Sequence, residues 1–308
     1  MLPLENGIVY GDRIFFLGSC FADEIGGICR GLGFDAMLNP FGTLFNPASI
    51  CDAISRLNEG RHFTENDVVK VDEGYYSTFS HNNRFWYNTP EKLLSEANAA
   101  LDKAIQHYNQ SKWVIISLGT AWCYRFAATG NIVSNCHKLP SSDFQRLRLT
   151  VDESAAILSE IVSRNADKRF IFTVSPLRHL SDGLHGNQLS KATLLLAVDK
   201  VCGDFKNANY FGAFEILLDE LRDYRYYKED MFHPSDQAVR YIWDKFREYA
   251  FDESCHKPME MAEKLRQMLD HKPFYPESKA YKSFLETIDK LKEELKAHYP
   301  KMNLENIL

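Results

Sequence analysis

Residues that together could carry out acyl transfer lie near both ends of the first 250 residues. Ser19 follows the apolar run from Ile14 to Leu17, and Asp230 precedes His233 by three residues. A serine hydroxyl is a weak nucleophile at neutral pH, so it needs a hydrogen-bonded base whose tautomer is fixed by a third group. The sequence therefore predicts a triad in which Ser19 attacks, His233 transfers the proton and Asp230 orients the imidazole.

The position of Ser19 at a strand end supports this interpretation. The apolar run stops at Gly18, and open α/β sheets place their ligand crevices at the carboxyl ends of parallel strands. Two alternatives stay open. Ser19 could merely cap the helix that begins near Phe21. Cys20 is a rival nucleophile, but a phosphatase-type C-x₅-R loop would need arginine where Gly26 stands, so we interpret Cys20 as a packed small residue.

The motifs resemble those of a known family. Gly18-Ser19-Cys20-Phe21-Ala22 is similar to the signature of the GSCFA family, which is grouped with the SGNH or GDSL-like hydrolases. The resemblance spans roughly residues 10 to 250. It implies that Ser19, Asp230 and His233 act as the triad and that middle motifs supply the oxyanion hole. Other matching motifs are Asn39-Pro40-Phe41-Gly42, Leu118-Gly119-Thr120-Ala121-Trp122, Asn135-Cys136-His137-Lys138, Ser175-Pro176-Leu177-Arg178-His179 with Asp182-Gly183 and Asn187, and Asp230 to His233.

One departure from the superfamily pattern concerns the oxyanion hole. The third block, G-x-N-D in the wider group, is represented here by Gly119-Thr120-Ala121-Trp122, which has no asparagine. The candidate donors are the backbone amides at Gly42 and Gly119 and the side-chain amide of Asn39. Simple turn chemistry explains Asn39-Pro40 equally well.

A dense polar cluster follows the strand predicted at residues 169–174. We expect it to bind a polar substrate group or to stabilise the loop beneath the site, and its first histidine, His179, could compete with His233 as the base. His137 could likewise bind substrate or hold the fold together, and a lone histidine is more often structural. The cluster comprises Arg178, His179, Asp182, His185 and Asn187.

Metal binding by this cluster is conceivable but not predicted. His179, Asp182 and His185 are candidate ligands, yet zinc sites usually place imidazoles at tighter spacing. We predict no metal and no cofactor.

Composition restricts the class of protein. The 308 residues are 45% hydrophobic and 25% charged, as expected of a globular chain, and the net charge of -6 gives no basic footprint for nucleic acid. We find no basic-then-apolar leader at the N-terminus and no membrane-spanning apolar run. Seven dispersed cysteines favour reduced thiols and a cytoplasmic location.

Short apolar runs alternate with helical patterns, which is typical of βαβ units. We predict an α/β/α sandwich with a central, mostly parallel sheet of SGNH topology over residues 1–250, interrupted by an insertion at about 48–110 with a small hairpin near Asn82-Asn83. Residues 251–308 form a helical extension. Predicted strands are 14–17, 113–118, 169–174 and 210–211, and predicted helices are 23–32, 151–164, 190–203, 215–223 and 238–249, with two or three more after 251.

These features predict a serine-dependent hydrolase of O-acyl esters. The ester is a small molecule or is carried on a carbohydrate or a lipid. Two alternatives stay open: an acyltransferase with the same triad, and a catalytically silent binding module in which Ser19 and His233 lie too far apart to hydrogen-bond. The aromatic residues from Tyr75 to Tyr87 are either a substrate wall or a small satellite core, and the second is more common. A homodimer formed through the C-terminal helices is also left open.

Overall fold

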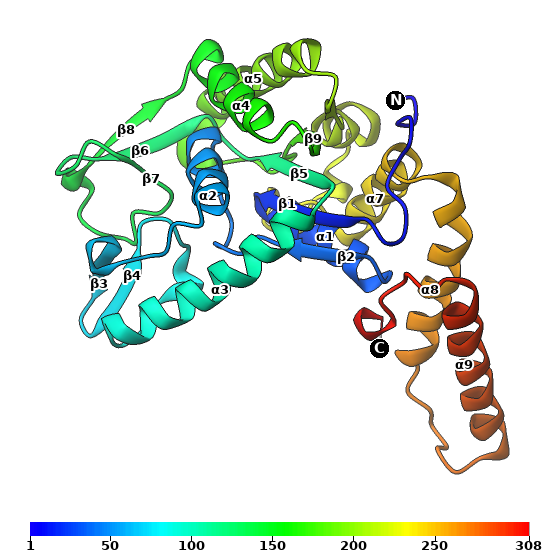
Figure 1. The fold of residues 1–308 in the computed structure, drawn as a ribbon. Helices are drawn as coiled ribbons and strands as arrows, with labels where there is room; N and C mark the ends of the chain where they lie inside the picture. Colours follow the sequence, from blue (N-terminus) through cyan, green and yellow to red (C-terminus); the bar gives the residue numbers. More distant parts are fainter. Residues whose placement is uncertain (308) are drawn as a thin grey trace.

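A five-stranded parallel sheet forms the centre of the protein (Figure 1). The computed structural model describes residues 1–307. The strands lie in the order β10-β9-β5-β1-β2, and every pair is parallel. This confirms the predicted α/β class. The strands are β1 (Arg13–Gly18), β2 (Asp35–Leu38), β5 (Trp113–Leu118), β9 (Arg169–Val174) and β10 (Ala208–Tyr210).

The two faces of the sheet bury separate cores because successive strand side chains point in opposite directions. Ile14 and Phe16 of β1 join one core, whereas Phe15 and Leu17 join the other. Helices α1 (Cys20–Gly31), α7 (Asp236–Ala250) and α8 (His256–Leu269) cover the first face. The second face is covered by α2 (Pro47–Glu59), α3 (Pro90–Gln110), α4 (Val151–Arg164) and α5 (Gly183–Asp204).

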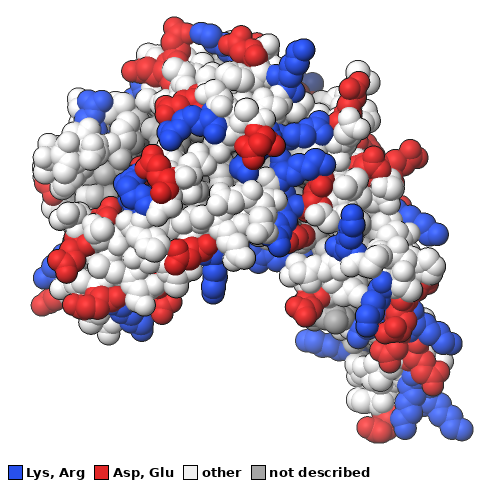
Figure 2. Space-filling view, viewed as in Figure 1, with Lys and Arg blue, Asp and Glu red and all other residues white. Residues whose placement is uncertain are grey.

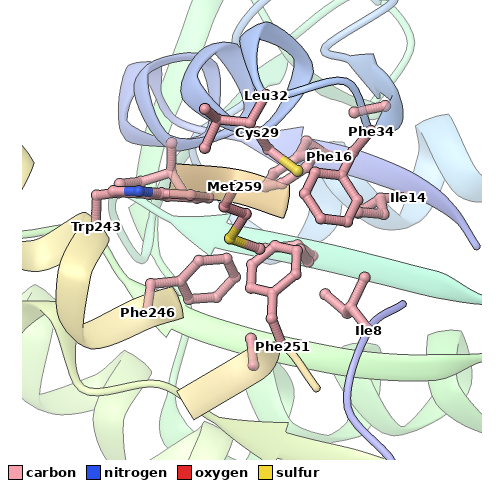
Figure 3. Close-up of a cluster of buried hydrophobic side chains, with 14 of the residues drawn as sticks. Ile8, Ile14, Phe16, Cys29, Leu32, Phe34, Trp243, Phe246, Phe251 and Met259 are labelled. Atoms are coloured by element: carbon pink, nitrogen blue, oxygen red, sulfur yellow. The ribbon is translucent and has the colours of Figure 1, made fainter. Parts of the chain in front are cut away.

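Side chains from distant parts of the chain meet in the first core (Figure 3). Met259 of α8 packs among Trp243 and Phe246 of α7, Phe16 of β1 and Cys29 of α1. All five are at most 2% exposed. This packing fixes α1, and therefore the turn that precedes it, against both the sheet and the C-terminal part of the chain.

The carboxyl ends of the three central strands meet at one edge of the sheet. Gly18 at the end of β1 pairs with Ser117 of β5, and Leu118 of β5 pairs with Val174 of β9. The segments that follow these strands therefore start side by side, as expected for a parallel sheet.

Most predicted elements are present, with shifted boundaries. The strands predicted at 113–118 and 169–174 and the helix predicted at 151–164 agree with the structure. Helix α1 starts at Cys20 rather than at residue 23, and α5 starts at Gly183 rather than at residue 190. The last short strand is 208–210, and the helix predicted at 215–223 consists of α6 (Ala213–Glu215) followed by a π-helical segment, Ile216–Leu221.

The hairpin predicted near Asn82-Asn83 was wrong. Asn82 accepts a hydrogen bond from the backbone amide of Arg84 and begins the short 3₁₀ helix Asn83–Phe85. The hairpin of this region is instead formed by β3 (Val68–Asp72) and β4 (Tyr75–Thr78), and its turn contains Gly74 with φ of 75°. A second antiparallel sheet contains β7 (Ile132–Val133), β6 (Trp122–Phe126) and β8 (Phe144–Arg148) in that order.

Two long helices follow residue 251, as predicted: α8 and α9 (Lys279–His298). They project from the α/β part as a hairpin (Figure 1). Figure 2 shows lysine, arginine, aspartate and glutamate side chains interspersed on this hairpin and on the rest of the face in view. Over residues 1–307 there is no helix that is both long and apolar enough to cross a membrane.

Candidate active site

Ser19 lies in the turn between β1 and α1, and its hydroxyl is buried. The backbone amide of Ser19 donates to the carbonyl of Ser117, at 2.9 Å, and the two serine hydroxyls hydrogen-bond at 2.9 Å. Ser19 Oγ also accepts from the amide of Phe21, at 3.3 Å, and so caps α1. The residue is only 1% exposed. The capping role considered for Ser19 is therefore present, and the hydroxyl faces the sheet.

Cys20 is the first residue of α1 and is partly exposed. The pKa of its thiol is raised, chiefly by burial and then by the nearby Asp23 carboxylate, while the backbone amides of Cys20 and Phe21 oppose this shift. These amides have no acceptor within the helix because they belong to its first turn. They form a polar, electropositive helix end next to the thiol.

Asn39 holds the turn from the opposite side. Its side-chain oxygen accepts from the amide of Gly18, at 2.8 Å, and its nitrogen donates to Asp23 at 2.9 Å. Asn39 has φ of 38°, a left-handed conformation that asparagine tolerates better than most residues. The other predicted oxyanion donors are also engaged: the amide of Gly42 donates to Asn39 at 2.7 Å, and that of Gly119 donates to Phe45 at 2.8 Å.

Asp230 and His233 are brought together as predicted. Asp230 Oδ2 lies 2.6 Å from His233 Nδ1, while Oδ1 accepts from the amides of Phe232 and His233 at 2.9 and 3.0 Å. The backbone donors, together with the imidazole, lower the pKa of Asp230 to about 2. An ionised Asp230 keeps the proton on Nδ1 of a neutral imidazole, so Nε2 is the basic nitrogen. The His233 side chain is half exposed.

The loop that carries His233 is anchored near the carboxyl edge of the sheet. Arg178, in the segment after β9, places its guanidinium 5.3 Å from the ring centroid of Tyr227, and the amide of Lys228 donates to the carbonyl of His233 at 2.8 Å. Glu24 of α1 and Asp236 of α7 line one cleft of about 680 Å³. The first turn of α7 therefore lies beside α1.

The triad itself is not assembled by hydrogen bonds. In the described part of the chain, the Ser19 hydroxyl bonds to Ser117 and Phe21 and makes no hydrogen bond with His233. The assignment of Ser19 as the nucleophile thus stays a prediction. The structure shows that its hydroxyl is buried and hydrogen-bonded to Ser117 and Phe21.

In the polar cluster after β9, His179 lies against Gly119, the residue that follows β5, whereas Arg178 contacts Tyr227 and His185 is exposed. The amide of His179 donates to Asn187 Oδ1 at 3.1 Å, and Nε2 of His179 would lie 3.1 Å from a Cβ added at Gly119. Burial, reinforced by Lys191, lowers the pKa of His179 to about 4. Asp182 contacts Arg146. Within residues 1–307, the histidine, cysteine, aspartate and glutamate side chains form no group of three or more that could hold a metal ion.

Lys191 is a residue that the motif search missed. It is 1% exposed, and its Nζ donates to the carbonyls of Gly119 and Ser175, at 2.7 and 2.6 Å, at the ends of β5 and β9. Burial lowers its pKa to about 7, although Cys20 and Asp182 act in the opposite direction. A lone lysine within the long apolar helix was the available sequence signal.

His137 is fully engaged within the fold. Its Nδ1 accepts from Trp86 Nε1 at 3.1 Å, and its Nε2 donates to the carbonyl of Thr78 at 2.8 Å. The ring is 1% exposed, and burial lowers its pKa. This geometry supports the structural role for His137.

Comparisons with known proteins place the chain in a family. No curated protein matches the sequence. Among solved structures, an acetyl xylan esterase from the rumen bacterium Butyrivibrio proteoclasticus is similar, with a TM-score of 0.38 and 12% identity, over 79% of this chain. The chain spans only 65% of that protein's length, and a likeness at this TM-score carries no functional argument. The family model "GSCFA family" matches residues 13–246, and "GSCFA domain protein, C-terminal domain" matches residues 262–308. Because the first match covers more than half of the sequence, the chain belongs to the GSCFA family.

Proposed function

We propose that the protein is an acyl-ester hydrolase with an SGNH-like arrangement of its catalytic groups. Ser19, in the turn between β1 and α1, attacks the ester, His233 is the general base and Asp230 orients it. The substrate is a small O-acyl ester, on a carbohydrate or a lipid, and the reaction needs no cofactor. Cytoplasmic location remains part of the proposal, supported by seven free thiols.

The observation that carries this proposal is the Asp230–His233 pair. The carboxylate is fixed by two backbone amides and contacts Nδ1 at 2.6 Å, which leaves Nε2 as the basic nitrogen on a half-exposed ring. This is the arrangement that general-base catalysis requires. The loop that carries the pair contacts Arg178, in the segment that follows β9, through Tyr227.

The chemistry would proceed in two steps. His233 Nε2 takes the proton of the nucleophile as it attacks the ester carbonyl, and then gives that proton to the leaving alcohol. Water, activated by the same nitrogen, then hydrolyses the acyl-enzyme. The developing oxyanion needs N–H donors, and the backbone amide of the partly exposed Cys20, in the first turn of α1, is one that no helical carbonyl engages. If an added alcohol captures the acyl group in preference to water, the protein is an acyltransferase.

A catalytically silent binding module is the second candidate. The observation that favours it is the burial of Ser19, whose hydroxyl is bonded to Ser117 rather than to His233. A module of this kind would turn over no ester, so one assay separates the two candidates.

Hydrolysis of p-nitrophenyl acetate by purified variants tests the proposal. We expect His233→Ala to lower kcat by about 10²–10⁴-fold, the usual contribution of a positioned general base, and Asp230→Asn to lower kcat with little change in KM. The matched control is His62→Ala. His62 and Asp102 form another exposed pair, 2.7 Å apart, so this variant loses a similar interaction and should keep full activity. Equal turnover by wild type and His233→Ala would refute the proposed function.

A further inference from the structure

Two arginines line a small cavity beside the loop that carries His233. The cavity has a volume of about 140 Å³. Arg178 reaches it from the segment after β9, and Arg222 from the end of the π-helical segment Ile216–Leu221. Among residues 1–307, neither guanidinium group has a carboxylate oxygen within 4.0 Å. A cavity lined by charges of one sign attracts a ligand of the opposite sign, so this cavity suits an anion.

The structure holds both arginines in place without a ligand. The Arg178 guanidinium lies 5.3 Å from the ring centroid of Tyr227, which is a cation–π contact. Arg222 has φ of 54°, a left-handed conformation that is costly for a residue with a side chain, and its amide donates to the carbonyl of Leu217 at 3.1 Å. Strained residues and π-helical segments are both frequent at functional sites. The direction of one guanidinium and the backbone that carries the other are therefore set in advance.

The remaining walls of the cavity suit an oxyanion that is attached to an organic group. Tyr227 lines the cavity, and burial raises its pKa, so its hydroxyl is protonated; this hydroxyl has no hydrogen-bond partner among residues 1–307. Leu217 and Leu218 supply apolar surface. Asp223 also lines the cavity, but its Oδ1 accepts from the amide of Arg225 at 2.9 Å and its Oδ2 lies 3.9 Å from Arg225 Nε. The one carboxylate of the cavity is thus already engaged by Arg225.

The cavity adjoins the proposed general base through the backbone. Tyr227 forms an antiparallel bridge with Pro234, the residue after His233. The amide of Lys228, the residue after Tyr227, donates to the carbonyl of His233 at 2.8 Å. A molecule in the cavity therefore lies against the loop whose imidazole would act on an ester.

We propose that Arg178 and Arg222 bind an oxyanion of the substrate, a carboxylate or a phosphate, so that the protein prefers esters that carry a negative charge. This rests on the proposed ester hydrolysis and names the substrate class for the same site. Guanidinium groups bind such oxyanions through paired N–H donors and stay charged at every physiological pH. The anion belongs to the acyl part or to the alcohol part of the ester.

Paired esters test the preference and locate the anion. p-Acetoxybenzoate and its methyl ester differ in the charge of the alcohol part, whereas mono-p-nitrophenyl adipate and its methyl ester differ in the charge of the acyl part. Release of the phenol gives kcat/KM for each. We expect the charged member of one pair to be preferred by about 10-fold, chiefly through KM, since a hydrogen bond to a charged group contributes an effect of this size. The pair that shows the preference identifies the part that carries the anion.

Variants assign the preference to the two arginines. Arg178→Gln and Arg222→Gln should each lower the ratio of kcat/KM for the charged and neutral esters to about threefold or less, and Arg222→Lys should retain more of it because it keeps the charge. The matched control is Arg225→Gln. Arg225 lies in the same loop, 5.1 Å from the ring centroid of Tyr226, but does not line the cavity, so this variant should keep the wild-type ratio. Circular dichroism and urea midpoints confirm that each variant folds.

Calorimetric titration tests the cavity without turnover. The probes are p-hydroxybenzoate and inorganic phosphate, which separate a carboxylate from a phosphate. We expect the wild type and Arg225→Gln to bind at least one probe, and both Arg178→Gln and Arg222→Gln to bind it more weakly. Added salt should weaken binding to the wild type, because it screens the attraction between exposed charges.

The outcomes separate this proposal from the proposed function. Equal kcat/KM for the charged and neutral members of both pairs overturns the anion preference and leaves ester hydrolysis standing. A preference that survives in both Arg178→Gln and Arg222→Gln also overturns the assignment to this cavity. Equal turnover by wild type and His233→Ala overturns the hydrolase function and the substrate class with it, even if the cavity binds an anion. A preference that depends on both arginines, with turnover that depends on His233, supports both proposals.

Discussion

Replacing Lys191 by methionine should change how stability depends on pH. The lysine is 1% exposed, and burial lowers its pKa from 10.5 to about 7. A neutral amine still has two N–H bonds, one for each of the carbonyls of Gly119 and Ser175 that it contacts. Lys191→Met keeps most of the volume of the aliphatic side chain. It removes the N–H donors and the titratable amine.

The magnitude follows from proton linkage. Between pH 7 and pH 10.5 the unfolded chain holds the lysine proton and the folded chain does not, so the stability of the wild type rises with pH across this window and is flat below it. One pKa unit corresponds to about 1.4 kcal/mol, so the wild type should gain about 2 kcal/mol relative to Lys191→Met from pH 7 to pH 9. The loss of the donor to the two buried carbonyls contributes a further cost to the variant that does not depend on pH, about 1–3 kcal/mol for each carbonyl.

Urea unfolding of both proteins at pH 7, 8 and 9, under reducing conditions, measures the difference. The unfolding free energy of the variant is subtracted from that of the wild type at each pH, which cancels the titration of the groups that both proteins share. The slope of this difference against pH therefore reports the titration of Lys191. Parallel stability curves would refute the reasoning, since they would mean that Lys191 carries the same proton in both states. A difference that shrinks as pH rises would refute it as well.

Two further predictions concern residues that hold the site together. Asn39→Ala should lower the free energy of unfolding by about 1–3 kcal/mol, since the buried amide of Gly18 loses its acceptor. Urea unfolding measures this loss, and an unchanged midpoint would contradict it. His137→Ala should destabilise the fold by about 2–4 kcal/mol through its two lost hydrogen bonds, while kcat/KM for p-nitrophenyl acetate stays at the wild-type value. A large fall in kcat/KM for folded His137→Ala would instead assign the imidazole to substrate binding.

The three central strands β1, β5 and β9 were predictable because they are short apolar runs followed by small residues, whereas the edge strand β2 was not predicted. The buried strands 113–118 and 169–174 have this form, and so their bounds agree with the structure. The D-x-x-H spacing likewise predicted a contact that depends only on local chain geometry. The hairpin predicted near Asn82 was wrong because the Asn82 side chain accepts from the backbone amide of Arg84 and begins a 3₁₀ helix there.

Other features depend on partners far away in the sequence. Ser19 turns inward because Ser117, 98 residues later, offers a hydroxyl and a carbonyl. Lys191 is retained in a buried helix because two strand ends leave carbonyls beside it. The residues next to Ser19 and Lys191 in the sequence do not reveal these distant partners. The residue types were visible in the sequence, but the direction in which each side chain points was not.

The backbone conformation at Gly18 is set by its contact with the neighbouring strand and not by the side chains that could perform the chemistry. Its φ is 131°, and a Cβ there would lie 2.1 Å from the carbonyl oxygen of Ser117, so contact between two strands excludes any side chain. The backbone path is thus set from outside the turn. A substitution at Cys20, whose side chain caps nothing, could alter the chemistry of the turn while Gly18 keeps its backbone path.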